Sequence, residues 1–158
     1  GATILDAGCG SGRDSLYFLE QGYEVTAIDA SEKLVELSSN LIAQQVLHMK
    51  FQDMNFSEEF VGIWACASLL HISREEIESV LNKFIKALVK DGVIYLSFKY
   101  GNQEIYRNGR LFNYYDYNSF MKLKSQFDQL KVLKTWKTAD AREERKDEYW
   151  LNALLKKI

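Results

Sequence analysis

The sequence has no proline, where about 5% is usual. Cysteine is almost as scarce: Cys9 and Cys66 alone cannot build a disulfide framework, so we expect a reducing, cytoplasmic setting. The longest nearly continuous apolar run, residues 61–70, is too short to span a bilayer. No basic segment followed by an apolar one opens the chain. These absences argue against a membrane protein and against a secreted, disulfide-stabilised one.

The residues that are present suit one globular domain. The chain has 158 residues, 47% of them hydrophobic, which is enough for one buried core and inconsistent with disorder or a coiled coil. We therefore expect residues 1–158 to form a single domain. The net charge is −2, but residues 1–79 carry 4 basic and 13 acidic side chains, whereas residues 80–158 carry 16 and 9. The basic residues are dispersed, so nucleic-acid binding is not expected from charge.

Strand-like and helix-like segments alternate along the chain, which predicts an α/β fold. The alternation indicates a parallel sheet with helices on both faces, a doubly wound architecture. The last two strands are joined by a connection too short for a crossover helix, so they should pair antiparallel as a C-terminal hairpin. The predicted strands number seven and cover residues 2–6, 23–28, 46–51, 61–66, 93–98, 130–136 and 149–155.

Short motifs predict where the helices begin and end. Ser31 is placed to cap a helix over 32–44, and Gly22 ends the helix before it. Ser73 and Glu76 form a capping-box pattern that opens a third helix, which Asp91–Gly92 is predicted to end. A fourth helix is predicted to begin at Asp116.

Residues 99–115 show no regular period and are expected to form a loop over a substrate site. Arginine and tyrosine are frequent there, and the alternative is ordinary packing over the sheet edge. The substrate-loop candidates are Arg107, Arg110, Tyr114 and Tyr115.

Three glycines follow the first strand and precede the first helix. Gly8, Gly10 and Gly12 allow positive φ and a close approach of the backbone to a ligand. A dinucleotide fingerprint also needs glycine five positions after the first, but Arg13 and Ser15 occupy the two positions that would qualify. No lysine follows the glycines, so a phosphate loop is excluded as well.

Carboxylates stand at the ends of three strands. Asp29 is placed to accept hydrogen bonds from ribose hydroxyls, and Asp53 from an exocyclic amine. Together with Asp6 they suit a ligand that is part nucleoside and part cation, and not a polyphosphate. The alternatives are a loop cap for Asp6, a helix cap for Asp29 and a turn residue for Asp53.

Over residues 3–152 the sequence resembles the class I S-adenosylmethionine-dependent methyltransferases. The resemblance is carried by the segments ILDAGCGSG, VTAIDAS, FQDM and ASLLHI, in that order and spacing. Within the family, GCGSGRDS is similar to small bacterial enzymes of the tellurite-resistance type. The resemblance implies a Rossmann-like fold, S-adenosylmethionine as cofactor, and an N-terminal cap segment that precedes Gly1.

The resemblance also assigns roles to the cofactor residues. It implies that the glycines wrap the methionine moiety, that Asp6 positions its amino group, that Asp29 binds the ribose, and that Met54 packs beside an adenine held by Asp53. The implied cofactor-binding set is Asp6, Gly8, Cys9, Gly10, Gly12, Arg13, Asp29, Ala30, Asp53, Met54, Ala67 and Ser68.

Other polar residues leave alternatives open. His71 follows the fourth strand and is a candidate general base, or alternatively part of the helix entry. Arg13 meets either the cofactor carboxylate or a surface acid. Cys9 and Cys66 are expected to be small apolar fillers, and no metal site is expected.

Methyl transfer to a small molecule, at O, N, S or a metalloid centre, is the predicted function. The sequence lacks the N/D-P-P-Y segment common in relatives that methylate amides and bases, which disfavours nucleic-acid acceptors. The alternatives are a non-catalytic S-adenosylmethionine-binding module and an RNA methyltransferase. No membrane partner is expected.

Overall fold

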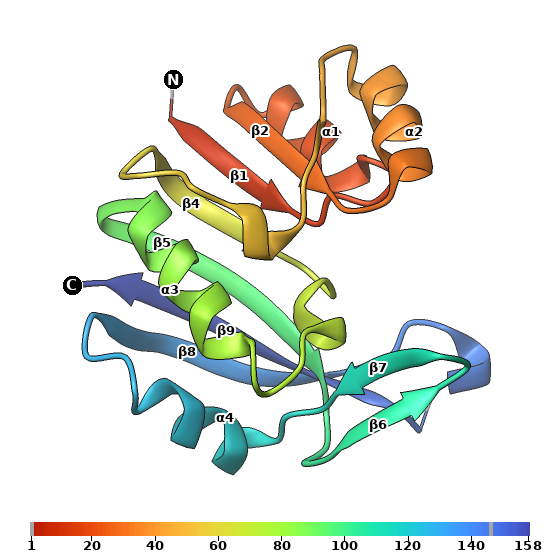
Figure 1. The fold of residues 1–158 in the computed structure, drawn as a ribbon, viewed down its shortest axis with the longest axis vertical. Coiled ribbons are helices and arrows are strands. Elements are labelled where there is room, and N and C mark those ends of the chain that lie inside the picture. The colour runs from red at the N-terminus through yellow and green to blue at the C-terminus, as the bar shows by residue number, and fades with distance from the viewer. Residues whose placement is uncertain (1, 146) are drawn as a thin grey trace.

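The fold is a twisted seven-stranded sheet flanked by helices (Figure 1). The computed structural model describes residues 2–145 and 147–158. The strands lie in the order β3-β2-β1-β4-β5-β9-β8, and only β9 runs antiparallel to its neighbours. Their bounds are β1 Thr3–Ala7, β2 Glu24–Asp29, β3 Leu47–His48, β4 Phe60–Ala65, β5 Leu88–Lys99, β8 Leu130–Ala139 and β9 Tyr149–Lys157. The predicted fold class is confirmed.

The helices lie on both faces of the sheet. The chain moves from β1 toward the β3 edge by way of α1 and α2, and from β4 toward the opposite edge by way of α3. Because these crossovers are right-handed, α1 and α2 lie on one face of the sheet and α3 on the other. Figure 1 shows α3 in front of β5 and β9, and α4 below the edge strand β8. The helix bounds are α1 Arg13–Glu20, α2 Glu32–Ile42, α3 Ile77–Ala87 and α4 Tyr117–Lys124. No described helix combines the length and the apolar character needed to cross a bilayer.

The apolar face of α3 belongs to the main hydrophobic core. Its buried side chains, Val80 and Phe84 among them, pack against sheet residues such as Leu5, Ile63 and Leu96. A smaller buried cluster beneath α1 and α2 includes Cys9. Both clusters anchor the strands whose carboxyl ends carry the site.

The end of α3 differs from its prediction. Ser73 Oγ does accept from the Glu76 amide (3.2 Å), but the helix begins at Ile77 and ends at Ala87. The prediction that Asp91–Gly92 ends it is wrong, because both residues lie inside β5. The Glu59 amide donates to the Ala87 carbonyl (2.9 Å), which draws the chain out of the helix and into pairing beside β4.

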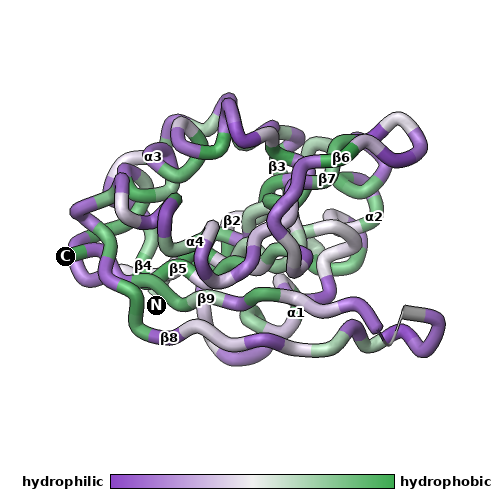
Figure 2. Tube along the Cα trace, turned by 90° about the horizontal axis from the view of Figure 1, so that it is seen from below, coloured by the Kyte–Doolittle hydropathy of each residue, from purple (hydrophilic) through white to green (hydrophobic). Residues whose placement is uncertain are grey.

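The segment 99–115 contains an unpredicted β-hairpin. Strands β6 (Glu104–Arg107) and β7 (Arg110–Asn113) pair antiparallel around the turn Asn108–Gly109. Both turn residues have positive φ, 54° and 76°, which is the type I′ geometry that Asn-Gly favours. Figure 2 shows this hairpin projecting from the body with a hydrophilic tip.

Candidate functional site

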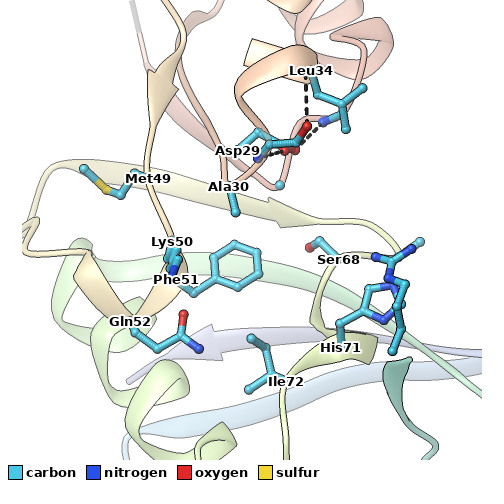
Figure 3. A pocket seen from close by; sticks show the side chains of 15 residues that line it. Asp29, Ala30, Leu34, Met49, Lys50, Phe51, Gln52, Ser68, His71 and Ile72 are labelled. Carbon is cyan, nitrogen blue, oxygen red and sulfur yellow. Dashed lines mark hydrogen bonds between the residues drawn. The ribbon is translucent and has the colours of Figure 1, made fainter. Parts of the chain in front are cut away.

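A cavity of about 590 Å³ opens at the carboxyl ends of β1, β2 and β4 (Figure 3). Parallel α/β sheets bind ligands at this place, where the strand order reverses. The predicted residues that line it are Gly8, Gly10, Asp29, Ala30, Ala67, Ser68, His71 and Arg110. The lining residues that the sequence did not indicate are Ser31, Leu34, Met49, Lys50, Phe51, Gln52 and Ile72.

The glycine loop turns tightly over the end of β2. The amides of Gly8 and Cys9 both donate to the Ile28 carbonyl, at 3.0 and 2.9 Å. Gly8 has φ 80°, and a Cβ there would lie 2.5 Å from Ser68 Cβ. Only glycine fits this close approach of the loop to the end of β4, which leaves the backbone exposed to a ligand.

Asp29 is held rigidly between the loop and α2. Its Oδ2 accepts from the Gly10 amide and its Oδ1 from the Ser31 amide, both at 2.9 Å (Figure 3). Ser31 caps α2 by accepting from the Leu34 amide (3.3 Å), so Asp29 is not the helix cap. A carboxylate accepts about four hydrogen bonds, and Asp29 therefore retains acceptor capacity toward the cavity.

Four residues of the implied cofactor set lie behind the loop or on the surface. Asp6 is buried and accepts from Ser15 Oγ (2.6 Å), and burial raises the pKa of Asp6 to about 6. Gly12 is buried against Ser38. Cys9 is buried too, and its burial raises the pKa of the thiol to about 11. The Arg13 side chain is 84% exposed and pairs with Asp14, which is the surface-acid alternative.

The turn after β3 presents other residues to the cavity than those expected. In the 3₁₀ turn η1 (Phe51–Asp53), Phe51 and Gln52 line the cavity, whereas Asp53 is exposed and is not among the lining residues. Met54 is 1% exposed and belongs to the core. Figure 3 shows the Phe51 ring reaching into the cavity. The aromatic residue beside the two polar ones in FQDM was the available signal.

The end of β4 contributes a buried hydroxyl. Ala67 has φ 54°, and its amide donates to Ser97 Oγ (2.8 Å). Ser68 Oγ is buried against Gly8 and, within the described residues, has no hydrogen-bond partner. A buried unpaired hydroxyl is costly, so Ser68 Oγ has unused hydrogen-bonding capacity beside the cavity.

His71 ends the 3₁₀ turn η2 (Leu69–His71) and lines the cavity in one defined tautomer. Its Nδ1 lies 2.8 Å from the Leu111 carbonyl. A carbonyl only accepts, so Nδ1 carries the proton and Nε2 the free lone pair. Burial lowers the pKa of His71, and Arg110 lowers it further, so the ring is neutral at neutral pH.

The four substrate-loop candidates lie in different surroundings in the structure. Only Arg110 lines the cavity. Tyr115 is 3% exposed and packs on Phe98, and the Tyr114 carbonyl accepts from Arg74 (2.8 Å). Arg107 is exposed, with its guanidinium over the Phe112 ring. No cluster of metal-ligating side chains occurs in the part of the chain that the structure describes.

The strand order, the glycine loop and the acidic residue after β2 define a nucleoside-binding α/β protein of the methyltransferase type. Residues 4–92, more than half of the chain, match the family model described as a methyltransferase domain. The chain belongs to this family, the class I S-adenosylmethionine-dependent methyltransferases.

Individual relatives agree with this assignment. The chain is 26% identical over 120 residues to an "Uncharacterized methyltransferase" of Staphylococcus carnosus, covering 76% of this chain and 58% of the relative. It is 24% identical over 138 residues to the "Probable S-adenosyl-L-methionine-dependent methyltransferase TehB" of Haemophilus influenzae, covering 75% and 48%. The chain thus spans about half the length of these curated relatives.

A solved structure shares the whole fold. It is the 1,6-didemethyltoxoflavin-N1-methyltransferase of Burkholderia thailandensis, with bound 1,6-didemethyltoxoflavin and S-adenosylhomocysteine. The TM-score is 0.86 at 21% identity, covering 99% of this chain and 71% of that one. At this identity the likeness concerns the fold.

Proposed function

We propose that this chain binds S-adenosylmethionine in the cavity and transfers its methyl group to a small-molecule acceptor. The observation that carries the proposal is the juxtaposition of the Gly8–Gly10 backbone, the fixed Asp29 carboxylate and the unpaired Ser68 hydroxyl around one cavity. The volume, about 590 Å³, lies within the usual range of about 300–1,000 Å³ for small-ligand sites.

The residues present fit the cofactor. Asp29 would accept from the ribose hydroxyls, Phe51 would pack against the adenine, and the loop at Gly8 and Gly10 would hold the methionine part. Ser68 Oγ would gain the hydrogen bond that it lacks. When bound, the cofactor supplies an electrophilic methyl group, so the protein needs no nucleophile of its own.

The chain's own contribution to the reaction is orientation and proton removal. His71 lines the cavity, and its hydrogen bond to the Leu111 carbonyl holds the ring in the tautomer whose Nε2 lone pair is free. A neutral imidazole there would accept the proton from an acceptor O–H or N–H as the methyl group is transferred. An acceptor held about 3–3.5 Å from the methyl carbon is in near-attack geometry.

A small acceptor is supported by two features. The cavity is modest in volume, and Arg110 of the β6–β7 hairpin lines it. The sequence has no proline, so it lacks the N/D-P-P-Y segment of relatives that methylate amides and bases. The Burkholderia thailandensis structure likewise holds a small organic acceptor beside its cofactor product.

Titration with S-adenosylhomocysteine tests the cofactor site. Asp29→Ala should raise the dissociation constant by roughly tenfold to hundredfold, because charge-assisted hydrogen bonds are lost. Asp53→Ala is the matched control and should bind as the parent does, because Asp53 is exposed and is not among the cavity-lining residues. Failure of the folded parent protein to bind S-adenosylhomocysteine would refute the proposal. Binding without turnover of any acceptor would favour a non-catalytic binding module.

A further inference from the structure

One face of the β6–β7 hairpin turns toward the cavity. Directly opposite residues of an antiparallel pair share a face, as do residues two apart on a strand. Arg107 pairs with Arg110 and Ile105 with Phe112, so these four side chains lie on one face. The Phe112 ring meets the His71 ring edge-on, with centroids 4.8 Å apart. This face therefore borders the candidate base.

The two arginines are directly opposite each other across the Asn108–Gly109 turn. Like charges in this position repel and destabilise the strand pair. In residues 2–145 and 147–158 neither guanidinium has a carboxylate within 4.0 Å. Arg107 instead lies over Phe112, and Arg110 lines the cavity. Arg110 therefore brings an uncompensated positive charge to the His71 side of the cavity, and the exposed Arg107 adds a second one directly across the strand pair.

The other charged groups of the cavity lie toward the cofactor side. Asp29 is already bonded to the loop and to α2, and Lys50 comes from the segment after β3. No described carboxylate lines the His71 and Arg110 side of the cavity. A negatively charged ligand group would thus meet attraction and no opposing acid there.

We propose that the methyl acceptor carries a carboxylate or phosphate group, which binds to Arg110 and Arg107 while its O–H or N–H faces His71. The proposal rests on the proposed function and adds the chemical class of the acceptor. Arginine suits this role because its planar fork donates two parallel hydrogen bonds to such groups. The anion would also relieve the repulsion between the two arginines.

The experiment uses protein saturated with S-adenosylhomocysteine and three probes that share a phenyl ring. Benzoate, phenyl phosphate and the neutral benzamide are titrated by calorimetry. We expect at least one anion to bind more tightly than benzamide by about tenfold or more. Arg110→Gln should weaken that anion by roughly tenfold to hundredfold, with Arg110→Lys in between. Lys122→Gln removes an exposed charge on α4 and should leave anion binding unchanged.

Each alternative result is distinct. Equal binding of the anions and benzamide, or no binding of any probe, overturns the inference. Loss of S-adenosylhomocysteine affinity in Arg110→Gln also overturns it, because the arginine would then serve the cofactor carboxylate. The proposed cofactor site itself fails if the parent protein does not bind S-adenosylhomocysteine, a result that is distinct from the failure of anion binding. A preference for phenyl phosphate over benzoate, or the reverse, identifies which anion the site takes.

Discussion

The two sides of the cavity are built by different means. The cofactor side, around Gly8, Gly10 and Asp29, is held by backbone groups of adjacent strands and loops. For example, two loop amides both donate to the Ile28 carbonyl. On the acceptor side, side chains join segments about 40 residues apart. Arg74 Nε donates to Asn113 Oδ1 (2.9 Å), and Asn113 Nδ2 donates to the Ile72 carbonyl (3.0 Å). The acceptor side therefore depends on side-chain contacts between distant segments, whereas much of the cofactor side is held by backbone hydrogen bonds.

The charge asymmetry of the sequence follows the same division. Residues 1–79, which include the glycine loop and Asp29, are predominantly acidic, and residues 80–158, which include the hairpin, are predominantly basic. S-adenosylmethionine carries a sulfonium and an ammonium against one carboxylate, so it is a net cation. An acidic half suits that cofactor, and a basic half suits the anionic acceptor proposed above.

The largest effect is expected at His71. His71→Gln should lower kcat by roughly 10²- to 10⁴-fold for an acceptor that loses a proton, while S-adenosylhomocysteine affinity stays unchanged. The proposed role needs His71 to be neutral, and burial lowers the pKa of His71. Activity should therefore be constant at neutral pH and fall only as the pH drops through a value below the ordinary 6.5.

His48 provides the control for this pH profile, because the chain has only two histidines. His48 is exposed, and its Nε2 lies 2.9 Å from the Ala30 carbonyl on the cofactor side. His48→Gln should leave the acid limb of the profile in place, whereas His71→Gln should remove it. If the limb survives in His71→Gln, His71 is not the base.

Adding a single methyl group at Gly8 is expected to disrupt the cofactor side. Gly8→Ala would put a Cβ 2.5 Å from Ser68 Cβ at a φ of 80°. We expect S-adenosylhomocysteine affinity to fall roughly tenfold to hundredfold, because the loop must move. Gly22→Ala is the control, with φ 93° but open space around its Cβ. It should lose about 1–2 kcal/mol of unfolding free energy and no affinity, and a loss of affinity equal to that of Gly8→Ala would contradict the steric account.

The same contrast explains how much the sequence could predict. The doubly wound sheet with its antiparallel C-terminal pair and the role of the loop glycines followed from local patterns, and Gly8, Gly10 and Gly12 do have positive φ. Asp53 could not be placed, because the 3₁₀ turn at η1, and not the spacing, determines which residues reach the cavity. The hairpin was detectable from Asn108–Gly109, but its strands show no clean alternation.

Contacts across long separations were beyond any sequence pattern. The bond from His71 to the Leu111 carbonyl joins residues 40 positions apart, and it fixes the tautomer on which the proposed chemistry depends. Asn113 is fully buried, yet nothing in its sequence neighbourhood marks it as the residue that joins β7 to η2. Tertiary packing alone sets both.

Asn113 offers a way to break the acceptor side without touching the cofactor side. Asn113→Ala leaves Arg74 Nε and the Ile72 carbonyl without this partner and should cost about 1–3 kcal/mol of unfolding free energy. Asn118→Ala, at an exposed position of α4, should change it by about 0.5 kcal/mol or less. Denaturant titration measures both, and calorimetry should show S-adenosylhomocysteine affinity retained. A large loss of that affinity would mean that the two sides are not separable.

The smallest effect is expected for the Arg107–Arg110 pair. Here the direction of the change in unfolding free energy is the informative result. Arg107→Glu turns a repulsive cross-strand pair into an attractive one, so it should raise the unfolding free energy of the ligand-free protein by roughly 0.5–1 kcal/mol. The lost contact with Phe112 offsets part of that gain. Arg107→Gln should lie between parent and Arg107→Glu in thermal denaturation. If Arg107→Glu stabilises the protein and abolishes anion binding, the hairpin keeps two like charges together for a ligand. If Arg107→Glu destabilises the protein, the two arginines do not repel each other enough to strain the strand pair.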